Sequence, residues 1–525
     1  MLYLGWLWVH FARLLARKIN PEDGIHAHMQ AYKTLEERFA RISSIEDAIG
    51  ILQWDAETMM PEGAADSRSD QLATLKGIAH ELLTARDTGD LLDQADQGSD
   101  RLDEWQRANL REMRRIYLHA AAVPADLVEA SSRAVSRAEL VWREARQNSD
   151  FALLLPHLSQ VLAFQRQIGQ AKGEALGLST YDALLDSYDP GLRQATIDPL
   201  FAELGTELPA LIQEAQERQK DLPAIQPLDG PFPVDDQRRI GEQLMKAVGF
   251  DFNRGRLDVS LHPFCGGSTG DVRITTRYSE ANFMSALMGV LHETGHALYE
   301  QGRPETWRRQ PVGLARGMSL HESQSLLIEM QACRSREFVT YLAPLVRETF
   351  QGEGSAWRSE NLYRILTRVE PGFIRVDADE ITYPAHILVR YELEKALIAG
   401  DLPIEDLPSA FNQEVRRLLG LSVPDDSLGC LQDIHWPGGA WGYFPTYTLG
   451  AMAAAQLFRA ACQADSNILP SLAKGDFAPL RTWLRTNVHA KGSLMTTDQL
   501  LVAATGRPLT AEVFRAHLRE RYLAH

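Results

Sequence analysis

The segment His292–Glu300 reads HETGHALYE. Residues four positions apart lie on the same face of a helix, so the imidazoles of His292 and His296 can reach one metal ion. Glu293 lies off this ligand line but close enough to act on a water at the metal. This is the H-E-x-x-H arrangement of zinc hydrolases. The apolar residues on both sides follow the helical period, namely Phe283, Leu287, Val290, Leu291, Ala297 and Leu298.

The composition is that of an ordinary globular protein, with 525 residues of which 45% are hydrophobic and 24% charged. The net charge of −16 argues against nucleic acid or an anionic membrane as a partner, because an acidic surface attracts neither. The cysteines show no C-x-x-C spacing, which favours a reducing, cytoplasmic compartment over a disulfide framework or a thiolate zinc site. They are Cys265, Cys333, Cys430 and Cys462.

The first residues need a separate interpretation. The apolar run Leu2–Val9 is too short to span a bilayer. Its positive residues follow the apolar run, whereas a signal peptide carries them in front, and no small-residue cleavage site follows. We therefore expect residues 1–28 to be an extension outside the fold, which would begin near Met29.

Helical periodicity dominates the chain, which predicts a mainly α fold. Residues 29–222 show it throughout, with a break at 61–63. Helices cannot run through the proline-rich stretch 222–235, so we interpret it as a connector to a second, catalytic half at about 236–525. The two halves together would form one domain. The connector prolines are Pro223, Pro227, Pro231 and Pro233.

Residues 257–278 are the exception to the helical pattern. Apolar and polar residues alternate there, and the turn sequences 265–267 and 269–270 interrupt the alternation. This pattern predicts a small antiparallel hairpin or three-stranded sheet immediately before the metal helix. A strand beside such a helix can hold an extended peptide by its backbone.

A catalytic zinc needs a third protein ligand and one open position. The best source is His321-Glu322-Ser323-Gln324, at the start of another helical segment. His321 and Glu322 point about 100° apart on a helix, so only one of them can face the site. We favour Glu322, since a carboxylate is usual where the third ligand comes from a separate helix. His321 would then support another ligand or belong to the core.

Several motifs, taken in order, resemble those of the M32 metallocarboxypeptidases, the family typified by carboxypeptidase Taq. Trp54-Asp55 and Met60-Pro61 near the start also fit, and the similarity extends from Met29 to the C-terminus. The first 28 residues match nothing in the family. Besides the H-E-x-x-H helix, the motifs are His262–Phe264, Asp271–Thr275, His321–Gln324, Ile374–Asp379 and Gly429–Trp436.

This resemblance implies a large, cleft-bearing helical fold with a small sheet beside the zinc helix, related to angiotensin-converting enzyme and neurolysin. It implies a homodimer that removes C-terminal amino acids from peptides with broad specificity. The expected cofactor is Zn²⁺, for which Co²⁺ often substitutes. The family's ligands fall on His292, His296 and Glu322, and its catalytic acid/base falls on Glu293.

Other residues are candidates for the oxyanion of the reaction. The related peptidases place a histidine and tyrosines near it, which points to His435, Tyr443 and Tyr447, with Tyr447 the preferred phenol. The alternative is that Tyr443 and Tyr447 only pack the cleft wall.

An exopeptidase also needs a cation that binds the free carboxylate of its substrate. Arg375 is our first candidate, with Arg273 or His435 assisting, and the motif of His262 adds a further substrate-binding candidate. The acidic residues at 377–380 could hold the Arg375 guanidinium in place, or form a purely structural salt bridge with it. Two alternatives remain: a related zinc oligoendopeptidase that lacks the carboxylate-binding cation, and a catalytically inactive helical scaffold.

Overall fold

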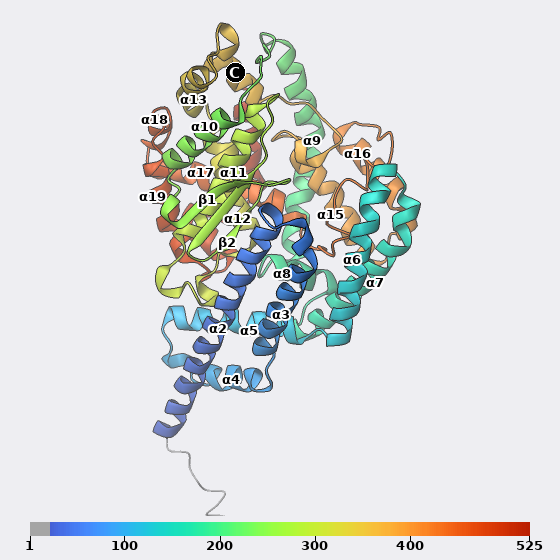
Figure 1. The fold of residues 1–525 in the computed structure, drawn as a ribbon, viewed down its shortest axis with the longest axis vertical. Helices are drawn as coiled ribbons and strands as arrows, with labels where there is room; N and C mark the ends of the chain where they lie inside the picture. Colours follow the sequence, from blue (N-terminus) through green and yellow to red (C-terminus); the bar gives the residue numbers. More distant parts are fainter. Residues whose placement is uncertain (1–20, 525) are drawn as a thin grey trace, which may run out of the picture.

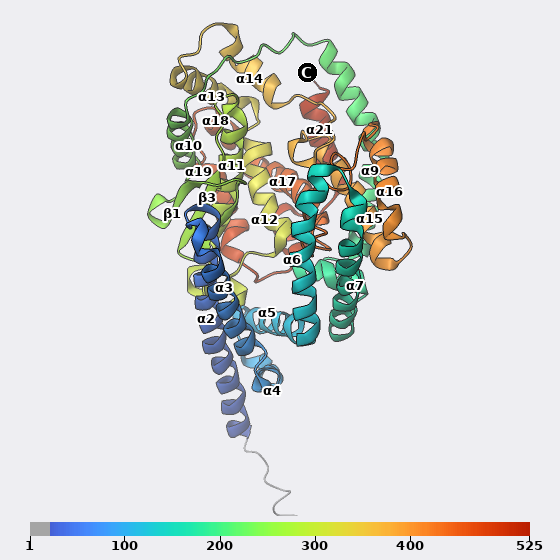
Figure 2. The ribbon, with the colours of Figure 1, turned by 45° about the vertical axis from the view of Figure 1, so that its right-hand side comes forward.

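The structure, a computed structural model, describes residues 21–524 (Figures 1 and 2). Helices make up most of this part, as the periodicity predicts, and no helix within it is long and apolar enough to cross a bilayer. The helices before the connector are α2 (Pro21–Thr58), α3 (Ala65–Leu83), α4 (Arg86–Asp96), α5 (Glu104–Ala121), α6 (Ala125–Asn148), α7 (Phe151–Leu176), α8 (Thr180–Tyr188) and α9 (Gln194–Lys220).

The catalytic half begins with α10 (Val234–Val248), followed by three strands and the metal helix. These are β1 (Gly255–Val259), β2 (Cys265–Ser268), β3 (Asp271–Thr276) and α11 (Phe283–Gly302). The next helices are α12 (Gly317–Leu326), continued by a π-helical turn (Leu327–Ala332), α13 (Arg336–Thr349), α14 (Ser359–Leu366), α15 (Tyr383–Ala399) and α16 (Leu407–Leu419). The last are α17 (Pro445–Ala464), α18 (Ile468–Leu472), α19 (Ala478–Asn487), α20 (Thr497–Thr505) and α21 (Ala511–Tyr522).

Helix α2 begins at Pro21, so it includes eight residues of the stretch we assigned to an extension. His28 in this part donates a hydrogen bond from Nδ1 to the Gln94 carbonyl in α4 (2.7 Å). The remaining residues of the predicted extension, 1–20, lie outside the described residues. The predicted breaks at 61–63 and in the connector both fall between helices.

The small sheet is mixed, which corrects the antiparallel prediction. Its strand order is β1-β3-β2, with β2 antiparallel and β1 parallel to β3. Alternation of apolar and polar residues reports which face of a strand is buried but not its direction, so it could not show that β1 is parallel. The sheet does lie beside the metal helix, because Leu257 and Ile274 pack against Val290 and Ala297 of α11.

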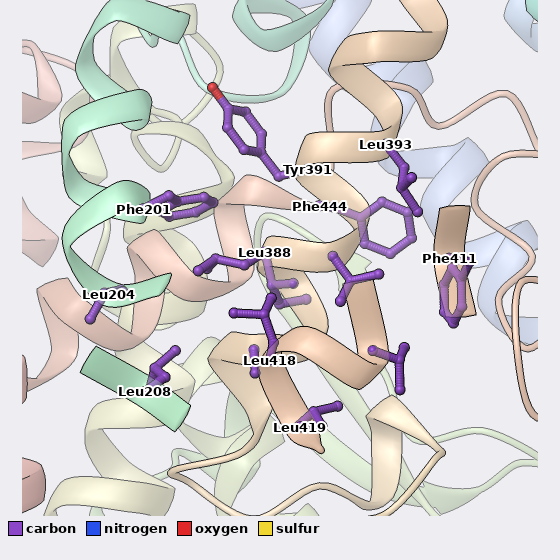
Figure 3. Packing of buried hydrophobic residues seen from close by; sticks show 14 of the residues in the cluster. Phe201, Leu204, Leu208, Leu388, Tyr391, Leu393, Phe411, Leu418, Leu419 and Phe444 are labelled. Atoms are coloured by element: carbon purple, nitrogen blue, oxygen red, sulfur yellow. The ribbon is translucent and has the colours of Figure 1, made fainter. Parts of the chain in front are cut away.

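One large hydrophobic cluster is built from residues of both halves of the sequence. Figure 3 shows Phe201, Leu204 and Leu208 of α9 beside Leu388 of α15 and residues of α16. The connector therefore joins helices that pack across the division. Elements from both halves are in contact around the site, and the geometry of that site depends on this packing.

Two glycines let the helices of the site approach closely. A Cβ on Gly295, between the two histidines of α11, would lie 2.6 Å from the Ser325 Cα of α12. A Cβ on Gly450 of α17 would lie 2.8 Å from the Glu322 Cβ. Both distances are shorter than a normal carbon–carbon contact. Helix α12 is thereby held between α11 and α17, with Glu322 in the contact.

Candidate active site

The side chains of His292, His296 and Glu322 converge at one point. The Glu322 Oε2 atom lies 3.3 Å from His296 Nε2 and 3.9 Å from His292 Nε2, and one ligand atom from each residue lies within 4.8 Å of the others. Ligand atoms about 2.1 Å from a tetrahedral ion are roughly 3.4 Å apart. The three residues therefore fit a divalent metal, and one coordination position would be left open.

The outer nitrogen of His292 is bound by a residue that our sequence analysis missed. His292 Nδ1 lies 2.9 Å from Glu329 Oε2, and Arg334 binds the other oxygen of this carboxylate at 2.6 Å. This partner turns His292 Nε2 toward the metal position. Glu329 stands in the π-helical turn after α12. Its spacing of seven residues from Glu322 was a usable signal, since such residues share a helix face.

His321 supports His296 and does not face the ligand point. The two Nδ1 atoms are 2.7 Å apart, so one donates to the other, and His321 Nε2 is 3.0 Å from Glu300 Oε1. Arg303 pairs with Glu300 at 3.1 Å. This chain of contacts fixes the ring of His296 with Nε2 toward Glu322. Of the two alternatives left open by the sequence, Glu322 is the one that lies with the histidines.

Glu293 lies beside the ligand point and is 7% exposed. Burial raises the pKa of its carboxyl to about 7, with His292 opposing the shift. Within residues 21–524 no side chain donates a hydrogen bond to it. A carboxylate in this position can accept a proton from a water at the open side of the metal site.

Arg375 is held by Asp433, not by its acidic neighbours in the sequence, which corrects that expectation. Its Nε donates to Asp433 Oδ1 (2.9 Å), and its Nη1 donates to the Tyr383 hydroxyl (3.2 Å). Arg390 binds the second oxygen of Asp433 through Nε (2.6 Å). Asp379 instead accepts from the backbone and side chain of Thr382.

Glu380, the other acidic neighbour of Arg375, points to the C-terminal helix. Its carboxylate accepts hydrogen bonds from Arg521 (2.9 Å) and the Tyr522 hydroxyl (2.9 Å), and it lies 2.8 Å from His517 Nε2. The Arg375 guanidinium therefore keeps its Nη2 group without a hydrogen-bond partner among the described residues.

The loop before α17 and its first turn gather the aromatic candidates. His435 Nε2 lies 3.2 Å from the Tyr447 hydroxyl, and the Arg375 guanidinium lies 5.0 Å from the centre of the Tyr447 ring. Tyr443 packs edge-on against Tyr447 and against Tyr188 of α8. Burial lowers the pKa of His435 to about 4 and raises that of Tyr447 to about 12. At neutral pH the phenol is protonated and can donate a hydrogen bond.

Comparison with known proteins identifies the family of this chain. Residues 34–522 match the family model of the carboxypeptidase Taq (M32) metallopeptidases. The chain belongs to the M32 family. Thermostable carboxypeptidase 1 of Thermus thermophilus is 40% identical over 505 residues, which cover 94% of this chain and 98% of that protein. Carboxypeptidase 1 of Bacillus subtilis is 33% identical, with 92% and 96% covered.

Solved structures of M32 proteins agree with this family assignment. Metallocarboxypeptidase 1 of Trypanosoma cruzi superimposes with a TM-score of 0.93 at 41% identity, over 94% of this chain and all of that one. An M32 carboxypeptidase from Deinococcus radiodurans gives 0.89 at 34% identity, with 94% and 99% covered. The protein is therefore a metallocarboxypeptidase whose substrates are peptides, and its family implies a divalent metal.

Two predicted substrate-binding residues of this M32 protein lie at the sheet, apart from the Arg375 cluster. Arg273 in β3 pairs through Nε with Asp271 (2.9 Å), and its guanidinium stacks 4.4 Å from the centre of the Trp54 ring in α2. It thus joins the sheet to α2. His262 is exposed in the loop between β1 and β2.

Proposed function

We propose that the chain is a zinc-dependent carboxypeptidase of broad specificity that removes C-terminal residues from peptides. The observation that carries this proposal is the convergence of His292, His296 and Glu322, with Glu293 next to them. When bound by these three residues, zinc supplies Lewis acidity that polarises the scissile carbonyl and acidifies water. Co²⁺ accepts the same nitrogen and oxygen ligands and is the expected substitute.

In this proposal Glu293 moves the proton. Its carboxylate takes a proton from the attacking water and gives it to the leaving amine, as a general base and then a general acid. Its side chain points away from the line of the two histidine ligands on α11, so it is available to a water and not to the metal. Among the described residues the neighbouring carboxylates are already engaged, because Glu322 faces the histidines and Glu329 is bound by His292 and Arg334.

Tyr447 is the proposed donor to the oxyanion. A pre-placed hydroxyl stabilises the negative charge that develops on the carbonyl oxygen. His435 fixes the orientation of this phenol through the 3.2 Å contact, and Tyr443 packs beside it. We assign His435 and Tyr443 supporting roles in the same step.

Arg375 is the proposed binding residue for the substrate carboxylate. Asp433, Tyr383 and the Tyr447 ring fix three sides of its guanidinium, and the Nη2 group remains for a ligand. A fixed cation next to the catalytic tyrosine would hold the last peptide bond at the metal. Arg273 and His262, located at the sheet, would contact residues farther from the substrate's C-terminus.

A digest of one peptide tests this proposal. The free acid should be shortened one residue at a time from its C-terminus, which mass spectrometry shows as a ladder. Its C-terminal amide should be resistant. Internal cuts in both peptides would instead favour the oligoendopeptidase alternative.

Three further parts of the proposal rest on the family and the sequence. The metal in the cell would be zinc, which atomic emission on protein purified without added metal can measure. The protein would be a homodimer, which sedimentation can measure. The location would be cytoplasmic, and the described cysteines support it because all four are free.

A further inference from the structure

A cavity of about 760 Å³ lies under the connector between α9 and α10. The connector forms one wall and α14 another, and the start of α11, Arg336 of α13 and the end of α21 also contribute to the lining. Sites for small molecules typically measure roughly 300–1,000 Å³ and are mostly apolar with a few polar groups. None of the residues proposed above for catalysis or substrate binding lines this cavity.

Paired hydrogen bonds hold the connector at two points. Gln219 Nε2 donates to the Val369 carbonyl (2.9 Å) and its Oε1 accepts from the Val369 amide (2.7 Å). Farther along, the Gln226 amide donates to Asn361 Oδ1 (2.9 Å), and Asn361 Nδ2 returns a bond to the Gln226 carbonyl (2.9 Å). Residues 222–225, which line the cavity, lie between these ties. The cavity is therefore a built feature, not a gap under a loose segment.

The lining combines apolar residues with polar ones, among which are four arginines and Glu360. Three of the four are paired: Arg336 with Glu360 at 3.0 Å, Arg368 with Glu370 at 2.9 Å, and Arg521 with Glu380 at 2.9 Å. The apolar part comprises Ile225, Pro227, Phe232, Phe283, Met284 and Tyr363.

Arg364 is the fourth arginine, and within residues 21–524 it has no ion pair and no hydrogen bond. A guanidinium that no carboxylate neutralises can form charge-assisted hydrogen bonds with a ligand carboxylate in the cavity. Arg364 is thus the group in the cavity that selects the charge of a ligand.

We propose that this cavity binds a small amphipathic monocarboxylate, with its carboxylate on Arg364 and its aliphatic or aromatic body against the apolar wall. A neutral apolar ligand would leave Arg364 unsatisfied. A dianion would need a second unpaired cation, and the other three arginines already have partners. The site goes beyond the peptidase function, because it uses none of that machinery.

Calorimetry with the zinc-loaded full-length protein tests the proposal, with octanoate as the probe and 1-octanol as its neutral analogue. Octanoate should bind with a stoichiometry of one and at least about tenfold more tightly than octanol, because only the acid forms a charge-assisted pair with Arg364. Equal affinity for the acid and the alcohol would overturn the proposal.

Variants locate the binding. Arg364→Gln should remove the preference for the acid, whereas Arg368→Gln should keep it, since Arg368 lines the same cavity but is already paired. Ala224→Trp, on the exposed connector, should abolish binding of both probes by filling the space. Octanoate binding that survives Arg364→Gln and Ala224→Trp but is lost in Arg375→Ala would place the ligand in the catalytic site and overturn the inference.

Discussion

Replacing Arg375 by alanine should convert the enzyme from one that requires a free C-terminus into one that is indifferent to it. The Arg375 side chain is 8% exposed, so a substrate carboxylate would pair with it out of contact with bulk water. Losing one partner of such a pair costs about 2–4 kcal/mol. At 1.36 kcal/mol per factor of ten, kcat/KM for a free-acid peptide should fall roughly 30- to 900-fold.

The rest of the site should survive this change. Asp433 keeps Arg390 as a partner, so the substitution leaves no buried carboxylate without a cation. Zinc content and thermal stability should therefore stay close to those of the wild type. Arg273→Ala is the matched control, since Arg273 also pairs with a carboxylate and stacks on an aromatic ring but lies at the sheet.

The assay compares kcat/KM for one peptide as the acid and as the C-terminal amide. The wild type should prefer the acid strongly, Arg273→Ala should retain that preference, and Arg375→Ala should cut the two peptides at similar rates. If Arg375→Ala keeps the preference for the acid, or if the wild type has none, the assignment of Arg375 as the carboxylate-binding residue is wrong.

Four further expectations concern the metal site and the surrounding charges. Glu293→Gln should bind zinc normally and lose about 10²–10⁴-fold in turnover, and near-normal kinetics would remove Glu293 from the mechanism. Glu322→Gln should lose zinc. His321→Ala should weaken zinc binding only about 10–100-fold, because His321 supports a ligand without being one. Metal analysis that shows the reverse order would exchange the two roles. Removing the metal with a chelator should lower the melting temperature and adding zinc should restore it, since a ligand of the folded state stabilises it; an unchanged melting temperature would argue against a buried ion. Burial raises the pKa of Glu380, but Arg521 and His517 outweigh it and hold this pKa far below the unfolded value of 4.5. The stabilisation that the Glu380 carboxylate gives to the fold is therefore present above pH 4.5 and is lost as the pH falls below it. Glu380→Gln should therefore lower the free energy of unfolding by about 3–5 kcal/mol at neutral pH. In acid the melting temperatures of the variant and the wild type should approach each other, and a difference that stays constant with pH would refute this.

The parts of the site that could be predicted from the sequence depend on local geometry. The spacing of His292 and His296 fixes their relative direction once a helix is assumed, and the helical period around them is clear. For His321 and Glu322 the same geometry shows only that one of them can face the site, and the choice of Glu322 rested on the ligand that is usual from a separate helix. Such inferences need no knowledge of how distant segments pack.

The parts that could not be predicted depend on contacts between distant segments. Asp433 binds Arg375 across 58 residues of sequence, while acidic groups within five residues of Arg375 point elsewhere. The parallel pairing of β1 with β3 has the same cause, since it depends on the path of the chain between them. The spacing of Glu329 from Glu322 shows that they share a helix face, but the contact of Glu329 with His292 depends on how α11 packs against the π-helical turn.

The arrangement of charge explains why this site calls for a cation. Glu293, Glu322 and Glu329 are brought together with two histidines in a buried region, and of the three carboxylates only Glu329 has an arginine on it. Burying a carboxylate is costly, and the charge partner of Glu322 among the described side chains is His292, which is itself one of the proposed metal ligands. A divalent ion at the ligand point would take over this role and leave the imidazoles neutral as ligands. The outer contacts to Glu329 and His321 then keep both imidazoles turned toward that ion, so the buried carboxylates and the histidines are stabilised by the same ligand.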